Sequence, residues 1–374
     1  MSDDVTGILG MEYPVLAFSH CRDVVAAVSR TGGFGVLGAV AHSPERLEVD
    51  LAWIEEHCGG RPYGVDLLLP EKYVGAGEGG LDREALSSML PPEHRHFVDE
   101  ILERYKVPPA IDEAEANAGL SLNISPAGYE PLLEVAFGHR IGLLASALGP
   151  PPAEVIEQAH ARGVKVAALA GSVHHARRHA EAGADLIIAQ GTEAGGHTGE
   201  IATMVLVPEV VDAVAPVPVL AAGGIARGRQ VAAAMALGAK GVWTGSVWLT
   251  TEEAETQPAV KEKFLRATSS DTIRSRSITG KPARMLRSAW TDAWEAPDSP
   301  GTLGMPLQPL LVGPALARIN RAAHQPGTGA NQLVNYFVGQ VVGSLTAVRP
   351  ARQVLLDMME EYADVIRGLC GGQP

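Results

Sequence analysis

Short apolar runs alternate with stretches of helical spacing along the first two thirds of the chain. An apolar run of about four to eight residues bounded by turn residues is typical of a buried strand, and a period of about 3.6 is typical of a helix. We expect strands at residues 14–18, 34–39, 63–69, 141–147, 164–170, 185–189, 217–222 and 241–245. We expect helices at residues 23–29, 43–57, 129–138, 153–161, 172–182, 207–214 and 230–237.

This alternation contains eight strand units in sequence order. Parallel strands need long crossover connections, so helical connections between strands indicate a parallel sheet. Two architectures fit this pattern, a closed (β/α)8 TIM barrel and an open, doubly wound sheet. The count of eight favours the barrel, and the predicted fold class is therefore an α/β TIM barrel.

Two segments depart from the alternation. Residues 71–127 contain glycine-rich, charged and helical pieces without a good strand, so we interpret them as an insertion after the third strand, with a helix near 92–105. Insertions at the carboxyl ends of barrel strands often cover the active site. Residues from about 251 onward lose the strand pattern. We therefore expect a barrel domain over 1–252 and a mostly helical region over 253–374 that packs on it.

The net charge of −13 argues against general nucleic-acid binding, which needs a basic surface. One local exception is a cluster of basic residues between Arg274 and Arg287. A solvated face is the favoured interpretation of this cluster. The alternative is a patch for an anionic substrate tail or for the chain's own acidic surface.

The cysteine count and the hydropathy of the chain indicate in which compartment the protein acts. Three cysteines without metal-like spacing predict neither disulfides nor a metal site, which fits a reducing cytoplasm. No secretory signal is visible at the N-terminus, and no apolar run approaches the roughly 20 residues that span a bilayer. We therefore expect a cytoplasmic protein without membrane or nucleic-acid partners that acts on a small molecule.

The strongest chemical signal is the stretch Ile188–His197, where a buried strand ends in a glycine-rich loop with a single histidine. Glycine lets the backbone lie directly against a ligand, and a histidine held there can carry a proton near neutral pH. Enzymes with α/β folds present catalytic groups in this way. The alternative is a plain turn between strand and helix with a histidine on the surface.

Two further strand ends are rich in glycine, Gly223–Gly224 and Thr244–Ser246. Phosphates often bind at the loops after the seventh and eighth strands of a barrel, against a helix N-terminus whose N–H groups attract negative charge. Ser246 adds a hydroxyl donor. We therefore favour a phosphate site here over turns that serve the fold alone.

Three segments resemble the nitronate monooxygenase family, formerly called 2-nitropropane dioxygenases. These segments are Ala189–His197, Pro218–Ile225 and Gly238–Ser246, and the similarity extends from Leu9–Gly10 through 32–35 to Ser275–Pro282. The resemblance implies a TIM barrel that binds FMN non-covalently. It also implies an oxidoreductase that uses O2 to oxidise alkyl nitronates and nitroalkanes.

Matching positions carry the family's roles onto this chain. The resemblance implies that His197 is the catalytic base beside the flavin and that Gln190 hydrogen-bonds the isoalloxazine ring. The flavin performs the redox step, while the protein orients the substrate and supplies the base. The other implied cofactor residues are Ala17, Phe18, Ser19, Asp66 and Gly195 at the ring, and Gly223, Gly224, Gly245 and Ser246 at the phosphate.

The chain departs from the family pattern at two places. The first strand runs into Ala-Phe-Ser-His20 instead of the usual Gln-Ala-Pro-Met segment, which makes His20 a second candidate base. Asp66 stands where the family usually has asparagine. This residue therefore either places a negative charge near the flavin or is a protonated carboxyl group.

Two other functions remain open at this point. Enoyl-thioester reductases that use FMN and NAD(P)H share this barrel and its Gly-Gly-His motif, and the basic cluster could then contact a phosphate of CoA or of a carrier protein. A flavin- or phosphate-binding protein without turnover is the third function. The chain has no separate Gly-x-Gly-x-x-Gly fingerprint, which mildly favours the monooxygenase. The sequence also leaves open whether the C-terminal helices pair two subunits as a homodimer.

Overall fold

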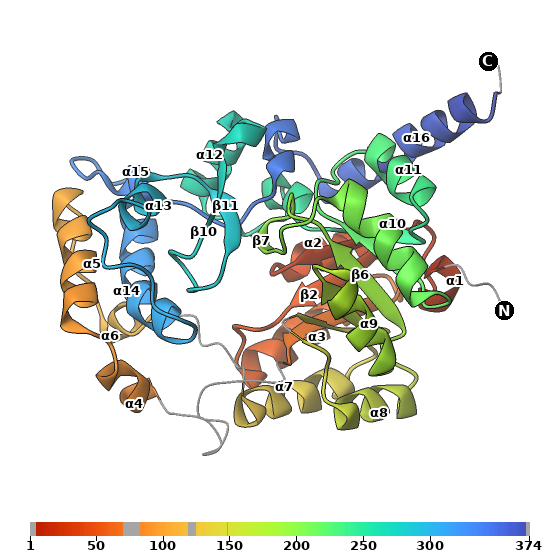
Figure 1. Ribbon diagram of the computed structural model, residues 1–374, viewed down its shortest axis with the longest axis horizontal. Helices are drawn as coiled ribbons and strands as arrows, with labels where there is room; N and C mark the ends of the chain where they lie inside the picture. The colour runs from red at the N-terminus through yellow and green to blue at the C-terminus, as the bar shows by residue number, and fades with distance from the viewer. Residues whose placement is uncertain (1–4, 70–82, 119–124, 148, 372–374) are drawn as a thin grey trace.

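Eight parallel strands close into a barrel (Figure 1). The computed structural model describes residues 5–69, 83–118, 125–147 and 149–371. In their order around the barrel the strands are β1 (Val15–Ser19), β2 (Phe34–Gly38), β3 (Tyr63–Leu68), β4 (Leu143–Ala147), β5 (Lys165–Ala170), β6 (Leu186–Gln190), β8 (Val219–Ala222) and β9 (Gly241–Thr244). Strand β9 pairs with β1 and completes the circle, so the predicted TIM barrel is confirmed.

Helices connect these strands and surround them, as the alternation predicts. They are α2 (Arg22–Thr31), α3 (Pro44–His57), α7 (Pro126–Gly138), α8 (Ala153–Ala161), α9 (Val173–Glu181), α10 (Thr203–Val214) and α11 (Gly228–Ala236). Local sequence explains their ends in several cases. At the start of α3 the Ser43 hydroxyl accepts a hydrogen bond from the Arg46 N–H at 3.2 Å, and Pro44 occupies the first turn.

The helix that completes the outer ring comes from the far end of the chain. Helix α16 (Ala351–Leu369) packs between α11 and α2, beside the first and last barrel strands. A Cβ atom on Gly228 would lie only 2.1 Å from the Met358 carbonyl oxygen, so glycine allows this close approach. A short helix that the sequence did not predict, α1 (Val5–Leu9), packs Val5 and Leu9 against the barrel interior.

Side chains along each strand alternate between the barrel interior and the surrounding helices. On β3, Val65 and Leu67 pack against helices, so Asp66 between them faces the interior. On β6, Ile188 belongs to the interior cluster and Ala189 to the outer one, which turns Gln190 inward. The pleat of β3 and of β6, which β4 and β5 separate, therefore turns both polar side chains toward the barrel interior.

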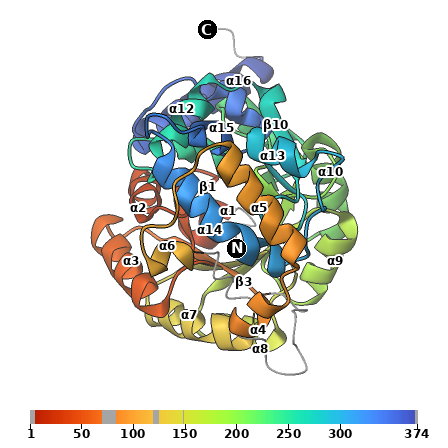
Figure 2. The same cartoon turned by 90° about the vertical axis from the view of Figure 1, so that its left-hand side faces the viewer.

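The insertion packs against the C-terminal region. It contains α4 (Arg83–Ser88), α5 (Pro92–Arg104) and α6 (Glu113–Ala116), all of which contact α14 (Leu307–Ala322). Arg318 donates to the Pro108 carbonyl oxygen at 2.9 Å, and Arg321 pairs with Glu115 at 2.6 Å. Figure 2 shows α5 and α14 together in front of the barrel end at which the strands finish. Residues 71–82 and 119–124 of the 71–127 segment lie outside the described residues.

The C-terminal region contains helices and, in addition, two strands that the sequence did not predict. Strands β10 (Thr272–Ser275) and β11 (Ala283–Leu286) form an antiparallel hairpin, and β11 also pairs with the short strand β7 (Gly196–His197). The basic cluster lies on this hairpin. Strand β7, in the loop after barrel strand β6, therefore shares one sheet with a hairpin that follows about 80 residues later. No local sequence pattern reveals this pairing.

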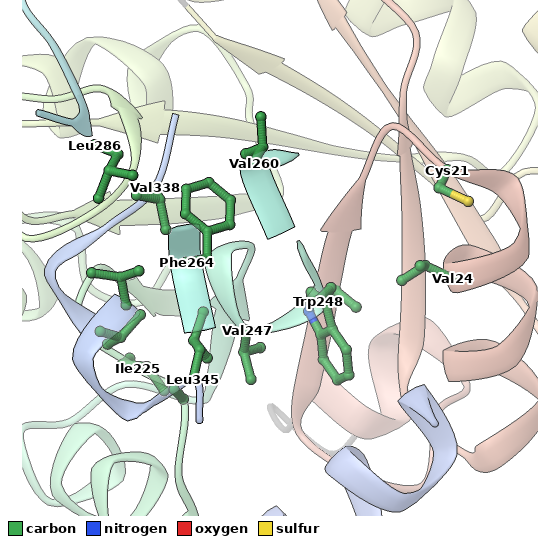
Figure 3. Packing of buried hydrophobic residues seen from close by; sticks show 14 of the residues in the cluster. Cys21, Val24, Ile225, Val247, Trp248, Val260, Phe264, Leu286, Val338 and Leu345 are labelled. Carbon is green, nitrogen blue, oxygen red and sulfur yellow. The ribbon is translucent and has the colours of Figure 1, made fainter. Parts of the chain in front are cut away.

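A second apolar core joins the barrel to the C-terminal region (Figure 3). The short helix η2 (Ser246–Thr250), directly after the last barrel strand, contributes Val247 and Trp248. Helix α12 (Pro258–Arg266) contributes Val260 and Phe264. Two further short helices, α13 (Ala289–Trp294) and α15 (Ala330–Leu333), contact each other in the same region. Within the described part of the chain, no helix has the length and apolar composition that crossing a membrane requires.

Candidate active site

The loop after β6 is held by a carboxylate within it. Glu193 accepts hydrogen bonds from the Thr203 N–H and the Thr203 hydroxyl, both at 2.9 Å. This bond satisfies an N–H at the start of α10 and gives the helix N-terminus a negative partner. Helix α10 consequently begins four residues before its predicted start at residue 207.

The β10–β11 hairpin supports the same loop from the other side. Arg284 donates to the Thr192 carbonyl oxygen at 2.7 Å, and Arg274 donates to the Thr198 carbonyl oxygen at 3.2 Å. Arg284 is only 8% exposed. The favoured interpretation of the basic cluster as a solvated face is therefore wrong for these two residues, because they bind loop carbonyl groups. Lys281 and Arg287 of the cluster are exposed.

His197 lies on β7, directly opposite Ala283 of the hairpin. Its Nε2 atom is 2.8 Å from the Thr279 hydroxyl oxygen, and its ring centroid is 6.2 Å from that of Phe337. Burial, with a smaller contribution from the charge of Lys281, lowers the pKa of His197 to about 4. The imidazole is therefore neutral at pH 7, which leaves one ring nitrogen free to accept a proton.

Asp66 and Gln190 place polar groups at the open end of the barrel interior. Neither side chain makes a hydrogen bond to another residue within the described part of the chain. Burial raises the pKa of Asp66 to about 8, so this carboxyl group is protonated at neutral pH and can donate a hydrogen bond. Asp66 is buried and Gln190 is half-buried. Buried polar groups normally have partners, so Asp66, with Gln190 at the same barrel end, is suited to bind a polar ligand that enters the barrel.

The protonation of Asp66 predicts an unusual pH dependence of stability. Between its ordinary pKa of 3.8 and its native pKa of about 8, the folded state holds a proton that the unfolded state has released. The free energy of unfolding should therefore fall as the pH rises across this range. Asp66→Asn should remove that decrease, which urea unfolding at pH 5 and pH 8.5 would measure.

The control for this test is Asp99→Asn, which changes an exposed carboxylate on α5. Asp99→Asn should retain the wild-type pH dependence. Identical pH dependence in wild type and Asp66→Asn would contradict a protonated Asp66.

Aromatic side chains lie beside these polar groups. Phe18 packs edge-on against His20 with ring centroids 5.1 Å apart, and it stacks near Trp243 at 5.9 Å. The His20 Nδ1 atom is 2.8 Å from the Gly38 carbonyl oxygen, so Nδ1 carries the hydrogen and donates it. Burial lowers the pKa of His20, and its ring is neutral at pH 7.

The residues predicted at the first strand differ in orientation. Phe18 faces the interior, whereas the Ala17 side chain belongs to the outer cluster beside the helices. The Ser19 hydroxyl accepts from the Cys21 N–H at 3.1 Å, just before α2. Only Phe18 of the three can therefore present its side chain to a ligand inside the barrel. A contact of Ala17 or Ser19 with a cofactor stays a prediction, and backbone atoms of these residues would have to make it.

The glycines of the predicted phosphate site have unequal surroundings. A Cβ atom on Gly195 would lie 2.8 Å from the Gly339 N–H nitrogen, so protein packing already explains the glycine at this position. Gly224 has a φ of +72°, and a Cβ atom there would meet nothing closer than Glu193 at 3.5 Å. Around Gly245 the nearest atom would be 3.9 Å away, on Phe18. Gly224 and Gly245 therefore border open space, which a ligand-binding site requires.

The remaining two residues of this site are already engaged by protein. The Ser246 hydroxyl accepts from the Gly339 N–H at 2.8 Å and still has its own hydrogen to donate. A Cβ atom on Gly223 would lie 2.9 Å from the Thr203 hydroxyl. The loops after β8 and β9 thus combine an open surface at Gly224 and Gly245 with a hydroxyl donor at Ser246.

These features define a barrel enzyme of the flavin-dependent oxidoreductase class. The chain belongs to the nitronate monooxygenase family, whose sequence model matches residues 5–361. It is 67% identical to a putative monooxygenase of Mycobacterium tuberculosis over 99% of both chains. It is 33% identical to a probable nitronate monooxygenase of Staphylococcus saprophyticus, with 76% of this chain and 78% of that protein covered.

Two solved structures are similar over nearly the whole chain. The nitroalkane oxidase of Streptomyces ansochromogenes has a TM-score of 0.80 and 26% identity, covering 98% of this chain and 100% of its own. FabK of Thermotoga maritima has a TM-score of 0.69 and 26% identity, covering 98% of each chain. The predicted family is confirmed by these similarities.

Sequence reasoning missed the residues that contact His197. Thr279 lies in Ser275–Pro282, a segment that carries part of the resemblance but to which the sequence analysis gave no role in the site. Phe337 lies in a part of the chain without any distinctive motif. The resemblance extended to Ser275–Pro282, far from the barrel motifs, and this was the available signal for Thr279. No signal in the sequence pointed to Phe337.

Proposed function

We propose that this protein is an FMN-dependent nitronate monooxygenase that oxidises alkyl nitronates and nitroalkanes with O2. The observation that carries this proposal is the neutral His197, fixed by Thr279 at the glycine-rich end of β6. A neutral imidazole with one unprotonated nitrogen is the group that proton abstraction from a carbon acid needs. Family membership supports the oxidation of nitronates as the reaction.

The barrel end offers matching groups for each part of FMN. Gly223, Gly224, Gly245 and Ser246 would hold the phosphate, since the chain borders open space at Gly224 and Gly245. Gln190 would hydrogen-bond the isoalloxazine ring because its amide both donates and accepts. Within the same interior Phe18 offers an apolar ring surface, and Asp66 offers a hydroxyl-type donor while it is protonated.

The chain's own residues perform the proton chemistry in this proposal. When bound, the flavin supplies the electron acceptor that the oxidation requires. The Thr279 hydroxyl donates its hydrogen to the Lys281 carbonyl oxygen at 3.3 Å, so it accepts from Nε2–H of His197. Nδ1 of His197 is then the base that removes the proton from the carbon beside the nitro group. Lys281 lies near enough to affect the His197 pKa, so its charge also attracts the anionic nitronate.

Anaerobic reduction of the bound flavin tests this function. We expect an alkyl nitronate such as ethyl nitronate to bleach the visible absorbance of the oxidised flavin, and NADH or NADPH to leave it unchanged. Fast bleaching by the nicotinamide alone would overturn the proposal. A purified protein that cannot be loaded with FMN would overturn it as well.

A second function, NAD(P)H-dependent reduction of enoyl thioesters of CoA or a carrier protein, has one specific observation in its favour. The similarity to FabK of Thermotoga maritima covers 98% of this chain, as does that to the nitroalkane oxidase. Arg276 and Lys281 are exposed beside the Thr279 loop and could pair with phosphate groups. Oxidation of NADPH that depends on an added enoyl-CoA would identify this activity. Absence of turnover with either substrate class would indicate a flavin-binding protein.

A further inference from the structure

Tyr336 lies on a segment that connects the C-terminal hairpin to the glycine-rich loop after β6. The Tyr336 carbonyl oxygen accepts a hydrogen bond from the Leu286 N–H of β11 at 3.1 Å. Four residues further on, the Gln340 N–H donates to the Glu193 carbonyl oxygen at 2.9 Å. The backbone of residues 336–340 is therefore fixed between β11 and the loop that carries the proposed base.

The Tyr336 ring is separated from the proposed base by one aromatic side chain. The ring centroids of Tyr336 and Phe337 are 5.6 Å apart, and those of Phe337 and His197 are 6.2 Å apart. The Tyr336 ring can therefore be no farther from the His197 ring than these two distances combined. One small substrate and its hydrogen bonds can span such a separation.

The Tyr336 side chain borders open space inside the protein. It is 37% exposed, whereas Val334, Asn335 and Val338 beside it in the sequence are buried. The surrounding protein nevertheless shields the phenol from bulk water and raises the pKa of Tyr336. His20, just after β1, shows the same combination of an accessible ring and a pKa shifted by desolvation. The accessible surface of Tyr336 therefore faces a hollow and not the outer surface of the molecule.

The Tyr336 hydroxyl is a donor that the protein leaves available. It makes no hydrogen bond to another residue within the described part of the chain. The segment before it is held from two sides, because the Asn335 amide donates to the Ser288 hydroxyl at 3.2 Å and Lys263 donates to the Val334 carbonyl oxygen at 2.8 Å. A donor on a fixed segment is oriented before any ligand arrives.

We propose that the Tyr336 hydroxyl donates a hydrogen bond to an oxygen of the substrate's nitro group while His197 removes the proton from the adjacent carbon. The inference rests on the proposed function and adds a second catalytic residue to it. In this step the proton passes to His197, the C–H electron pair forms a C=N bond, and an N–O electron pair moves onto a nitro oxygen. A neutral O–H group directed at that oxygen stabilises the negative charge as it develops.

The substrate is a better partner for this hydroxyl than the flavin. The polar groups proposed for the flavin ring, Asp66 and Gln190, belong to barrel strands. Tyr336 and His197 instead lie beside β11, outside the barrel. A substrate that gives its proton to His197 and its electrons to the flavin lies between these two sets of groups, where its nitro oxygens can meet Tyr336.

Two forms of one substrate separate this role from a purely structural one. In Tyr336→Phe we expect kcat for nitroethane to fall roughly a hundredfold, the usual effect of losing one such donor. Ethyl nitronate is already charged when it binds, so its KM should rise roughly tenfold while its kcat changes less than threefold. The matched control is Tyr362→Phe, a half-buried tyrosine on α16, which should change neither parameter. Equal kcat for nitroethane in wild type and Tyr336→Phe would overturn the proposal.

A binding measurement separates failure of this role from failure of the proposed function. Propionate shares the planar anionic head of a nitronate but cannot be oxidised at it. Titration calorimetry of the flavin-loaded proteins should show propionate binding roughly tenfold to a hundredfold more weakly to Tyr336→Phe than to the wild type and to Tyr362→Phe. This loss in a protein that oxidises no nitronate would retain Tyr336 as an anion donor and reject the monooxygenase. Equal propionate affinity in the three proteins would overturn the proposal.

A second variant covers the case in which Tyr336→Phe is not stable. Tyr336→Phe removes one oxygen atom and keeps the ring beside Phe337, so we expect it to melt at the wild-type temperature. Tyr336→Met lacks a donor as well and should show the same loss of propionate affinity. Wild-type propionate affinity in a folded Tyr336→Met protein would count against the Tyr336 hydroxyl as the donor.

Discussion

Replacing His197 with glutamine is expected to lower kcat/KM for neutral nitroalkanes by roughly a hundredfold to ten-thousandfold, the usual contribution of a positioned general base. Glutamine keeps a polar side chain that can still reach Thr279, but it cannot accept a proton at neutral pH. Steady-state oxygen consumption with nitroethane would measure the loss. The flavin content of the variant should equal that of the wild type.

The same variant should behave differently with a substrate that has already lost its proton. Oxidation of pre-ionised ethyl nitronate should fall less than about tenfold, because no base is needed for that step. The control is His20→Gln, since His20 is the other candidate base at the barrel end. A large loss in His20→Gln with little change in His197→Gln would transfer the role of base to His20.

The low pKa of His197 adds a pH dependence to this prediction. The folded state disfavours a proton that the unfolded state binds below the ordinary pKa of 6.5, so this residue reduces stability as the pH falls from 6.5 to about 4. Its effect therefore has the opposite sign to that of Asp66. Nitroalkane oxidation by the wild type should show no loss from protonation of His197 until the pH approaches about 4.

Placing a carboxylate at Gly224 is expected to weaken FMN binding roughly a hundredfold to a thousandfold. Two unit charges about 4 Å apart repel by about 4 kcal/mol at an effective dielectric constant near 20, and the FMN phosphate is at least singly negative. The position has room for a side chain, so the expected loss comes from repulsion of the FMN phosphate and not from steric conflict with protein. Titration of the apoprotein with FMN, followed by flavin fluorescence, would measure the affinity of Gly224→Asp.

Gly163→Asp is the matched control for this variant. Gly163 has a φ of +74°, close to the +72° of Gly224, and a Cβ atom there would meet nothing within 4 Å. Both substitutions therefore carry the same backbone strain, and both proteins should melt at similar temperatures. Gly163 follows α8 on the exposed surface and should not affect FMN. Equal FMN affinity in the two variants would contradict the placement of the FMN phosphate at the Gly224 loop.

Local patterns were sufficient for the barrel because each unit carries its own signals. The run 185–189 predicts β6, observed at Leu186–Gln190, since a short apolar stretch between turns can bury both of its faces. Ser43 and Pro44 mark the start of α3 in the same local way. The glycine-rich ends of the strands indicated where ligands bind, because parallel strands bring their carboxyl ends to one side of the sheet.

Contacts between distant segments were beyond the reach of such patterns. Helix α10 begins at Thr203 because Glu193 binds its first N–H, and this carboxylate belongs to the preceding loop. The charge pattern predicted that Arg274 and Arg284 belong to a solvated basic cluster, yet they bind carbonyl oxygens of a loop that is 76 and 92 residues away, respectively. Side-chain hydrogen bonds of this kind depend on which segments meet after folding. The order of charged residues along the chain does not predict these contacts.

The sequence by itself determined the TIM barrel, the family and the candidate residues at the strand ends, because strand and helix periodicity and glycine-rich turns are local properties. Only the tertiary structure decided the protonation of His197 and Asp66. Their pKa values depend on burial and, for His197, on a charge from the β10–β11 loop, and both are products of packing. The tertiary structure likewise brought Thr279 to His197, because segments 82 residues apart in sequence meet there.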